Sequence, residues 1–223
     1  MKTVRTLGAI FCAALSAVFA AIGIGMLIPI DGAGMFRYYT VDANLVAAVS
    51  GLLLAVFLIR SLLRKKPVPV WILLSYFTAA VCLTVTFLIV VFVLAPAEGG
   101  AGRLLTEGDM LFHHLLNPLC TAIGALFLMP RIPTKIPEMA HIALLPTELY
   151  GLFAIVANYL LWWHGPYPFL CIYEQPLQES VLWCVGILGG TYVTGFFMAM
   201  AKKAIMPCPQ KKYGFGSRRA VLF

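Results

Sequence analysis

Charged residues are scarce in this 223-residue chain: 11% are Asp, Glu, Lys or Arg, whereas 61% are hydrophobic. A soluble domain is roughly 45–50% apolar and 25% charged, so this composition excludes a soluble globular fold. The six cysteines include no CxxC pair, and their positions do not indicate a disulfide framework. Internal repeats and low-complexity segments are also absent from the sequence.

Long apolar runs dominate what is present. A helix of about 17–25 residues crosses the hydrocarbon core of a bilayer, and backbone groups in lipid must be paired within their own segment. The first run is too long for the apolar region of a signal peptide, so we predict a retained helix there. We predict an all-α polytopic membrane protein whose single domain, 1–223, has six transmembrane helices over about 7–30, 43–63, 69–95, 111–129, 142–163 and 180–201.

The basic residues are distributed unevenly between the two predicted sides. Fourteen of the 16 Lys and Arg residues fall on one side, and Arg37 and Arg103 fall on the other. The positive-inside rule predicts that both termini are cytoplasmic. A basic inner face against anionic lipid accounts for the net charge of +7, so no nucleic-acid partner is expected. The 14 cations are Lys2, Arg5, Arg60, Arg64, Lys65, Lys66, Arg131, Lys135, Lys202, Lys203, Lys211, Lys212, Arg218 and Arg219.

Polar residues gather near the predicted outer ends of three helices. Polar and ionisable groups are costly inside a membrane, so a cluster of them is a functional-site hypothesis by default. Helices that run from outside to inside also present free backbone N–H groups at this face, which suits an anionic group or an oxyanion. The cluster comprises Thr40, Asp42, Asn44, Glu107, Asp109, His113, His114, Asn117, Asn158, Tyr159, His164 and Tyr167.

Within this cluster, Asp109, His113 and Asn117 are spaced four residues apart. This spacing predicts that they share one helical face, where a carboxylate can orient an imidazole. His114 should point about 100° away. Pro118 lacks an N–H and should kink the helix near this point.

Purely structural roles, such as helix capping and hydrogen bonding to the backbone, also fit these residues. Thr40, Asp42 and Asp109 are good helix N-cap residues. A lone histidine, whether His113 or His114, is commonly satisfied by a backbone carbonyl. These alternatives remain open on spacing alone.

Three segments in a fixed order suggest a family: RYYTVDANL at 37–45, EGDMLFHHLLNP at 107–118 and GPYPFL at 165–170. On a six-span chain they resemble the androgen-induced and androgen-dependent transmembrane proteins, and most closely a short bacterial branch. The resemblance to that branch implies a bacterial inner membrane, with the active face on the outer side. These are membrane threonine hydrolases that cleave fatty acid esters of hydroxy fatty acids. The resemblance covers nearly the whole chain in organisation, although each motif is short.

The resemblance implies that Thr40 is the nucleophile and that His113, five residues before Pro118, is the base. Two positions depart from the animal proteins. Met110 stands where they have a further His, and His114 stands where they have Thr. Hydrolysis is still expected, with a less certain substrate.

The mechanism expected is nucleophilic acyl transfer without a cofactor. A threonine hydroxyl needs an adjacent base, so His113 would take the proton of Thr40 and Asp109 would orient the imidazole. The substrate would be a membrane lipid ester reached from the outer leaflet. The residues expected to contact it are Arg37, Asn44, His114, Asn117 and Tyr167.

Two rival functions fit the same polar cluster. Asp109, His113 and His164 could bind a metal that activates water, because two His and a carboxylate form a known catalytic zinc set. The cluster could also be the vestibule of a non-enzymatic lipid or ion carrier, although transporters tend to carry repeats and midplane sites.

Overall fold

A computed structural model describes residues 2–206 of the chain. Within them, six helices are long and apolar enough to cross a membrane, which confirms the predicted all-α, multi-pass architecture. Lys211, Lys212, Arg218 and Arg219, which entered the charge count, lie outside the described residues, as does Cys208. The six spans are Thr3–Arg37, Tyr39–Arg64, Val70–Ala97, Gly108–Leu128, Ile136–Tyr159 and Leu177–Ile205.

Several spans are built from more than one helical segment. The first contains α1 (Lys2–Asp31) and the 3₁₀ turn η1 (Gly32–Arg37); the second is α2 (Tyr39–Arg64); the third contains α3 (Val70–Ile89), the π segment η2 (Val90–Leu94) and α4 (Ala95–Ala97). After α5 (Gly102–Thr106), the fourth contains α6 (Gly108–Met110), the π segment η3 (Leu111–Leu116), α7 (Asn117–Ile123) and the π segment η4 (Gly124–Leu128). The last two are α8 (Ile136–Tyr159) and α9 (Leu177–Ile205), joined by a loop with the 3₁₀ turn η5 (Pro168–Leu170).

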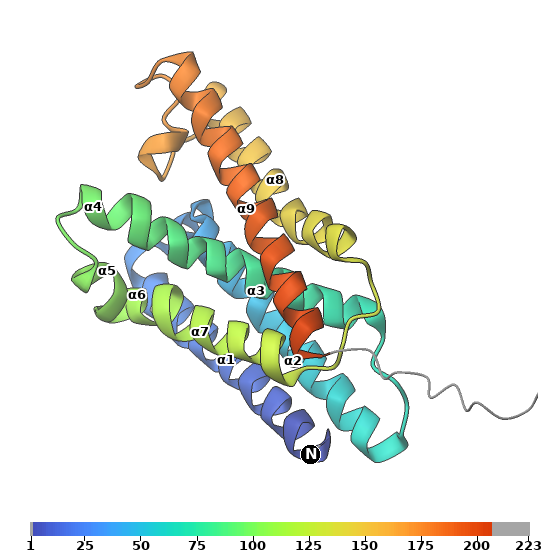
Figure 1. Ribbon diagram of the computed structural model, residues 1–223. Coiled ribbons are helices and arrows are strands. Elements are labelled where there is room, and N and C mark those ends of the chain that lie inside the picture. The colour runs from blue at the N-terminus through green and yellow to red at the C-terminus, as the bar shows by residue number, and fades with distance from the viewer. Residues whose placement is uncertain (1, 207–223) are drawn as a thin grey trace, which may run out of the picture.

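Helix α3 lies at the centre of the bundle and contacts α2, α7, α8 and α9 (Figure 1). Its apolar side chains are buried on several faces, and Tyr76 and Phe77 are completely enclosed. Helix α1 packs closely on α2 at Gly51, where a Cβ atom would lie 2.6 Å from the carbonyl oxygen of Ala13. Small residues permit this kind of close approach between membrane helices.

The fourth span departs from ordinary α geometry just before Pro118. The sequence predicts a kink there, and the structure contains the π segment η3, in which the backbone N–H of Asn117 bonds to the carbonyl of Phe112. A proline removes one N–H donor from the helical ladder, and a π turn is one way to re-pair the neighbouring carbonyls. The wider turn changes which side chains share a face.

Helix α8 begins at Ile136, six residues before the predicted start. Pro137 occupies the first turn, where a missing N–H costs nothing, and Glu138 accepts a hydrogen bond from the backbone N–H of Lys135. The longer helix places Glu148 near its middle.

The two ends of the bundle differ in charge. We call the end formed by residues 31–38, 97–108 and 160–176 the acidic end; the opposite end, with the N-terminal turn of α1 and the last turn of α9, is the basic end (Figure 1). At the basic end the buried Nζ of Lys202 donates to the carbonyl oxygen of Met129 at 2.6 Å. That contact pairs a carbonyl that the end of η4 leaves free.

Candidate functional site

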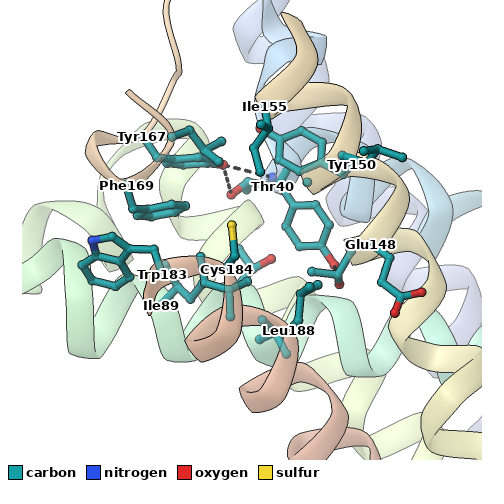
Figure 2. Close-up of a pocket in the computed structure, with 18 of the residues that line it drawn as sticks. Thr40, Ile89, Glu148, Tyr150, Ile155, Tyr167, Phe169, Trp183, Cys184 and Leu188 are labelled. Atoms are coloured by element: carbon teal, nitrogen blue, oxygen red, sulfur yellow. Dashed lines mark hydrogen bonds between the residues drawn. The ribbon is translucent and has the colours of Figure 1, made fainter. Parts of the chain in front are cut away.

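A cavity of about 260 Å³ lies among α3, α8, α9 and the α8–α9 loop, in the half of the bundle nearer the acidic end (Figure 2). Its surface is almost entirely apolar, which favours a hydrocarbon occupant. The aliphatic and aromatic side chains that line it are Val85, Ile89, Val90, Leu94, Leu152, Ile155, Phe169, Leu170, Trp183, Ile187 and Leu188.

Hydroxyl groups line one part of this cavity. The Oγ1 atom of Thr40 and the phenol oxygen of Tyr167 are 3.4 Å apart, and the backbone N–H of Thr40 also donates to that phenol at 3.4 Å (Figure 2). Nearby, the Tyr39 hydroxyl lies 2.7 Å from Oγ1 of Thr147. The polar part of the cavity can therefore hold a polar group at one end of an apolar chain.

Thr40 occupies the first turn of α2. The residue before the helix is Tyr38, in extended conformation, and no side chain caps the N-terminus. Neither Thr40 nor Asp42 therefore serves as the cap that their residue types permit. The Tyr167 phenol instead accepts a hydrogen bond from the free backbone N–H of Thr40. The side chain of Thr40 lies at the cavity wall.

The α8–α9 loop brings Tyr167 to this position. The Tyr167 and Phe169 rings stack with centroids 5.1 Å apart, and Phe169 packs in turn on Trp183 of α9. Gly165 allows the tight return of the chain, because a Cβ atom there would lie 2.8 Å from the carbonyl carbon of Leu170. Burial raises the pKa of Tyr167, so its phenol stays protonated at neutral pH and can donate a hydrogen bond.

The imidazole of His113 faces α1 and does not line the cavity. A Cβ atom on Gly23 would lie 2.7 Å from Cε1 and 2.8 Å from Nε2 of this ring. The side chain is 1% exposed, and within residues 2–206 neither ring nitrogen makes a hydrogen bond of good geometry. The ring lies against the backbone of α1 at Gly23. Thr40 and His113 are linked indirectly: Nδ2 of Asn44 donates to the carbonyl of Thr40 at 2.8 Å and to that of His113 at 3.4 Å.

No hydrogen bond joins Asp109 to the ring of His113 within residues 2–206, although the four-residue spacing predicts one. Nδ1 of the neighbouring His114 lies 2.8 Å from the carbonyl oxygen of Leu104. The physical reason is η3, because i to i+5 bonding moves residue 114 toward the face that an α-helix would give to residue 113. His114 is thus a buried histidine in contact with a backbone carbonyl, away from the cavity lining.

Asn44 and Asn117 belong to a buried polar network between α1, α2 and α7. Nδ2 of Asn117 donates to Oδ1 of Asn44 at 2.6 Å. Ser16 and Thr121 donate to Oδ1 of Asn117 at 2.6 Å and 3.1 Å. Both asparagines are fully buried and neither lines the cavity, so in this structure they join helices and do not face a ligand.

Arg37 lies at the surface of the acidic end. Its Nη2 is 3.3 Å from Oδ1 of Asp31, and its Nε donates to the carbonyl of Gly34. Its own carbonyl accepts a hydrogen bond from the Tyr150 hydroxyl at 2.7 Å. Among the eight predicted site residues, the structure brings together Thr40 and Tyr167 at the cavity.

Other cavity residues were not singled out from the sequence. Tyr39 lies inside the RYYTVDANL segment, in which the sequence predicts a catalytic role for Thr40 and none for Tyr39. Thr147 and Tyr150 come from an apolar helix with no local motif, so spacing gave no signal for them. Glu148 also lines the cavity, with its carboxylate directed away from Thr40 (Figure 2).

The structure does not gather Asp109, His113 and His164 as metal ligands. Within residues 2–206, the one group of three or more side chains placed to hold a metal ion is His164, Cys171 and Glu174. The described part of the chain is thus a multi-pass helical membrane protein with a threonine at the wall of an apolar cavity. Comparison with protein-family models, curated proteins and solved structures finds no match to this chain.

Proposed function

We propose that the protein is an integral-membrane lipid-ester hydrolase with Thr40 as its nucleophile. The observation that carries the proposal is the Thr40 hydroxyl at the wall of a cavity whose lining is otherwise almost wholly apolar. Such a cavity suits an acyl chain with its ester beside Thr40. At about 260 Å³ it is slightly smaller than a typical small-molecule site, so it would hold an acyl segment and not a whole lipid.

In the proposed reaction, Oγ1 of Thr40 attacks the acyl carbonyl and displaces the alcohol, leaving an acyl-threonine that water then hydrolyses. The Tyr167 phenol, a hydrogen-bond donor at neutral pH, would hold the carbonyl oxygen as it becomes negative. The expected substrates are fatty acid esters of hydroxy fatty acids or related acyl lipids, drawn from the outer leaflet of the bilayer.

His113 is the proposed base, and the proposal requires its ring to move. The imidazole would turn from Gly23 toward Thr40, take the threonine proton and return it to the departing alcohol. Catalytic hydrogen bonds are commonly long or absent before substrate binds. The ring lies against the backbone of α1 at Gly23, so the turn would give up that contact.

Lipid binding without hydrolysis is the second candidate function. The absence of His113 from the cavity lining favours it, because within residues 2–206 no hydrogen bond joins a basic side chain to the hydroxyl of Thr40. Under this alternative the same cavity would hold an acyl chain, and the hydroxyls of Thr40 and Tyr167 would bind its polar end. Turnover and binding must therefore be measured separately.

Turnover is tested with the purified full-length chain in detergent and a fatty acid ester of a hydroxy fatty acid, by following released fatty acid. Thr40→Ala should lower the rate at least about 1,000-fold, since loss of a nucleophile removes the covalent route. His113→Ala should lower it comparably. Thr84→Ala, a threonine of α3 bonded to the carbonyl of Ala80 and away from the cavity lining, is the matched control.

Binding is tested with a non-hydrolysable ether analogue of the same lipid. Thr40→Ala should still bind the analogue, whereas Ile187→Trp should exclude it by filling the cavity. Full turnover by Thr40→Ala would refute the hydrolase proposal. A wild-type protein that binds the analogue but releases no fatty acid from the ester would support lipid binding without hydrolysis. If Ile187→Trp binds the analogue as well as the wild type does, the cavity is not the lipid site, and both proposed functions of the cavity are refuted.

A further inference from the structure

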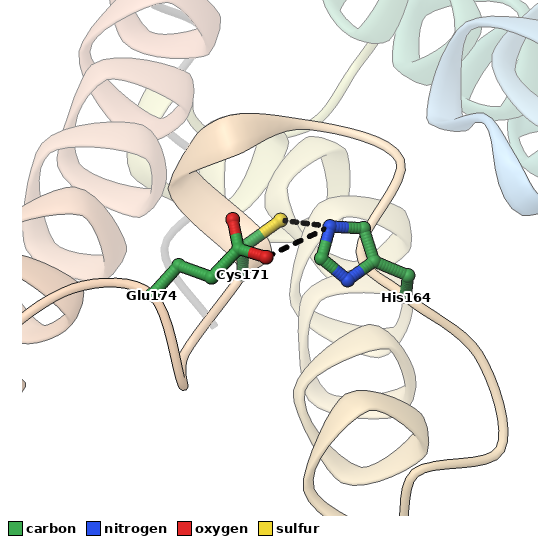
Figure 3. Close-up of side chains that lie close together, drawn as sticks. All are labelled: His164, Cys171 and Glu174. Atoms are coloured by element: carbon green, nitrogen blue, oxygen red, sulfur yellow. Dashed lines mark hydrogen bonds and ion pairs between the residues drawn. The ribbon is translucent and has the colours of Figure 1, made fainter.

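A second side-chain cluster lies in the α8–α9 loop, outside the cavity that contains Thr40. His164, Cys171 and Glu174 face a solvent-open depression of about 290 Å³. Figure 3 shows the sulfur of Cys171 and a carboxylate oxygen of Glu174 both directed at one ring nitrogen of His164. These three residues are a thiol, an imidazole and a carboxyl group, which are the ligand types that zinc prefers in proteins.

The two distances from Nε2 of His164 match those of a tetrahedral zinc site. Sγ of Cys171 is 3.3 Å from Nε2 of His164, and Oε1 of Glu174 is 3.4 Å from the same nitrogen. Zinc bonds of about 2.3 Å to sulfur and about 2.0–2.2 Å to nitrogen and oxygen, at tetrahedral angles, separate sulfur from nitrogen by about 3.5 Å and nitrogen from oxygen by about 3.4 Å. All three ligand atoms lie within 4.8 Å of one another.

The local backbone fixes two of the three ligands relative to each other. The N–H of Glu174 donates to the carbonyl of Cys171 at 3.0 Å, which closes a turn and puts both side chains on one side of it. The N–H of Ile172 donates to Oδ1 of Asn158, which ties the same turn to the end of α8 at 3.1 Å. The turn that carries Cys171 and Glu174 is thus held by hydrogen bonds before any ion binds.

Hydrogen bonding alone accounts poorly for the Cys171 sulfur. The sulfur lies 3.3 Å from Nε2 of His164, 3.4 Å from the carbonyl of Tyr167 and 3.5 Å from that of Gly165. The ring N–H can donate to the sulfur, but the thiol has one proton and can donate fully to only one of the two carbonyls. A metal ion would bind the sulfur and imidazole directly.

We propose that His164, Cys171 and Glu174 bind one Zn²⁺ ion, with water in the fourth position. Binding replaces the thiol proton of Cys171, which passes to solvent, and leaves the imidazole neutral and the carboxylate charged. The side chains of His164 and Glu174 are 67% and 65% exposed, so the ion reaches the site from water. The ion would hold in place the α8–α9 loop, which positions Tyr167 at the cavity. This inference does not depend on hydrolysis by Thr40.

The test loads the full-length protein in detergent with Zn²⁺ after chelator treatment and measures bound metal after desalting. One zinc per chain is expected. Cys171→Ser, His164→Ala and Glu174→Gln should each weaken binding at least 10-fold, measured by competition with a chelating dye, because each removes a metal ligand. His141→Ala and Cys12→Ser, matched residue types on α8 and α1, should retain one zinc per chain.

Cobalt provides a readout that needs no variant to fold. Co²⁺ bound at this site should give a thiolate-to-cobalt charge-transfer band in the wild-type protein, and Cys171→Ser should lack it. Wild-type protein that keeps no zinc after desalting would overturn the proposal. Zinc that is retained equally by all three ligand variants, or cobalt without a thiolate band, would also overturn it.

Discussion

At the scale of single residues, His113 is the most unusual side chain of the site. Its side chain is 1% exposed, and within residues 2–206 its ring nitrogens make no hydrogen bond of good geometry, a condition that is uncommon for buried polar groups. Its ring is held against α1 by contact with Gly23. The proposed catalytic role requires that contact to be released.

A methyl group at position 23 would therefore disturb the protein through His113. In Gly23→Ala the new Cβ would lie within 3 Å of the ring, so the imidazole must shift, and we expect a loss of stability of about 1–3 kcal/mol. The measurement is thermal unfolding in detergent. Gly25→Ala is the control, because no atom lies within 4 Å of its Cβ position, and equal behaviour of the two variants would show that His113 does not contact α1.

The hydroxyl of Tyr167 can be removed without removing its ring. In Tyr167→Phe the stacking on Phe169 should persist, whereas the contact with Thr40 is lost. Removing one oxyanion donor typically costs about 100-fold or more in rate, so lipid-ester turnover should fall by about 100-fold with analogue binding retained. Tyr173→Phe, whose hydroxyl bonds to Tyr159 outside the cavity, should keep full turnover. Unchanged turnover in Tyr167→Phe would exclude the phenol as the oxyanion donor.

At the scale of helices, composition was enough to predict the six spans, because five charge-free runs, and a sixth interrupted only by Glu148, are each long enough to cross a bilayer. The sequence was less informative about which side chains share one face of a helix. The spacing of Asp109 and His113 assumes α geometry, and the π segment η3 just before Pro118 replaces that geometry with a wider turn. Thr40 and Tyr167 were selected individually, but their contact depends on the tertiary path of the α8–α9 loop.

Glycines in α2 and α9 differ in what surrounds them. Close helix packing explains Gly51 of α2, whose Cβ position is 2.6 Å from the carbonyl oxygen of Ala13, whereas Gly189 of α9 has open space around it. Gly51→Ala should therefore push α1 from α2 and destabilise the protein by about 1–3 kcal/mol. Gly189→Ala should have little effect or be slightly stabilising, since alanine is the better helix former. Thermal unfolding of both variants tests the α1–α2 contact. Equal unfolding temperatures for Gly51→Ala and Gly189→Ala would contradict it.

At the scale of the whole molecule, the charge difference between the acidic and basic ends predicts orientation in the membrane. The positive-inside rule places the acidic end, and with it Thr40, on the outer side. In a cysteine-free background, Glu98→Cys should react with a membrane-impermeant thiol reagent in intact cells. Lys66→Cys should react after permeabilisation only. The reverse pattern would put the cavity on the inner side and exclude a substrate from the outer leaflet.

The central claim is that Thr40 forms a covalent bond to an acyl group, and mass spectrometry of a trapped adduct tests it most directly. The wild-type protein is treated with a covalent serine/threonine-hydrolase probe, digested and mapped. The account predicts that the probe is attached to Thr40, that the ether analogue competes with labelling, and that Thr40→Ala is unlabelled while Thr84→Ala is labelled normally. A wild-type protein without an adduct, or an adduct that persists in Thr40→Ala, would contradict it.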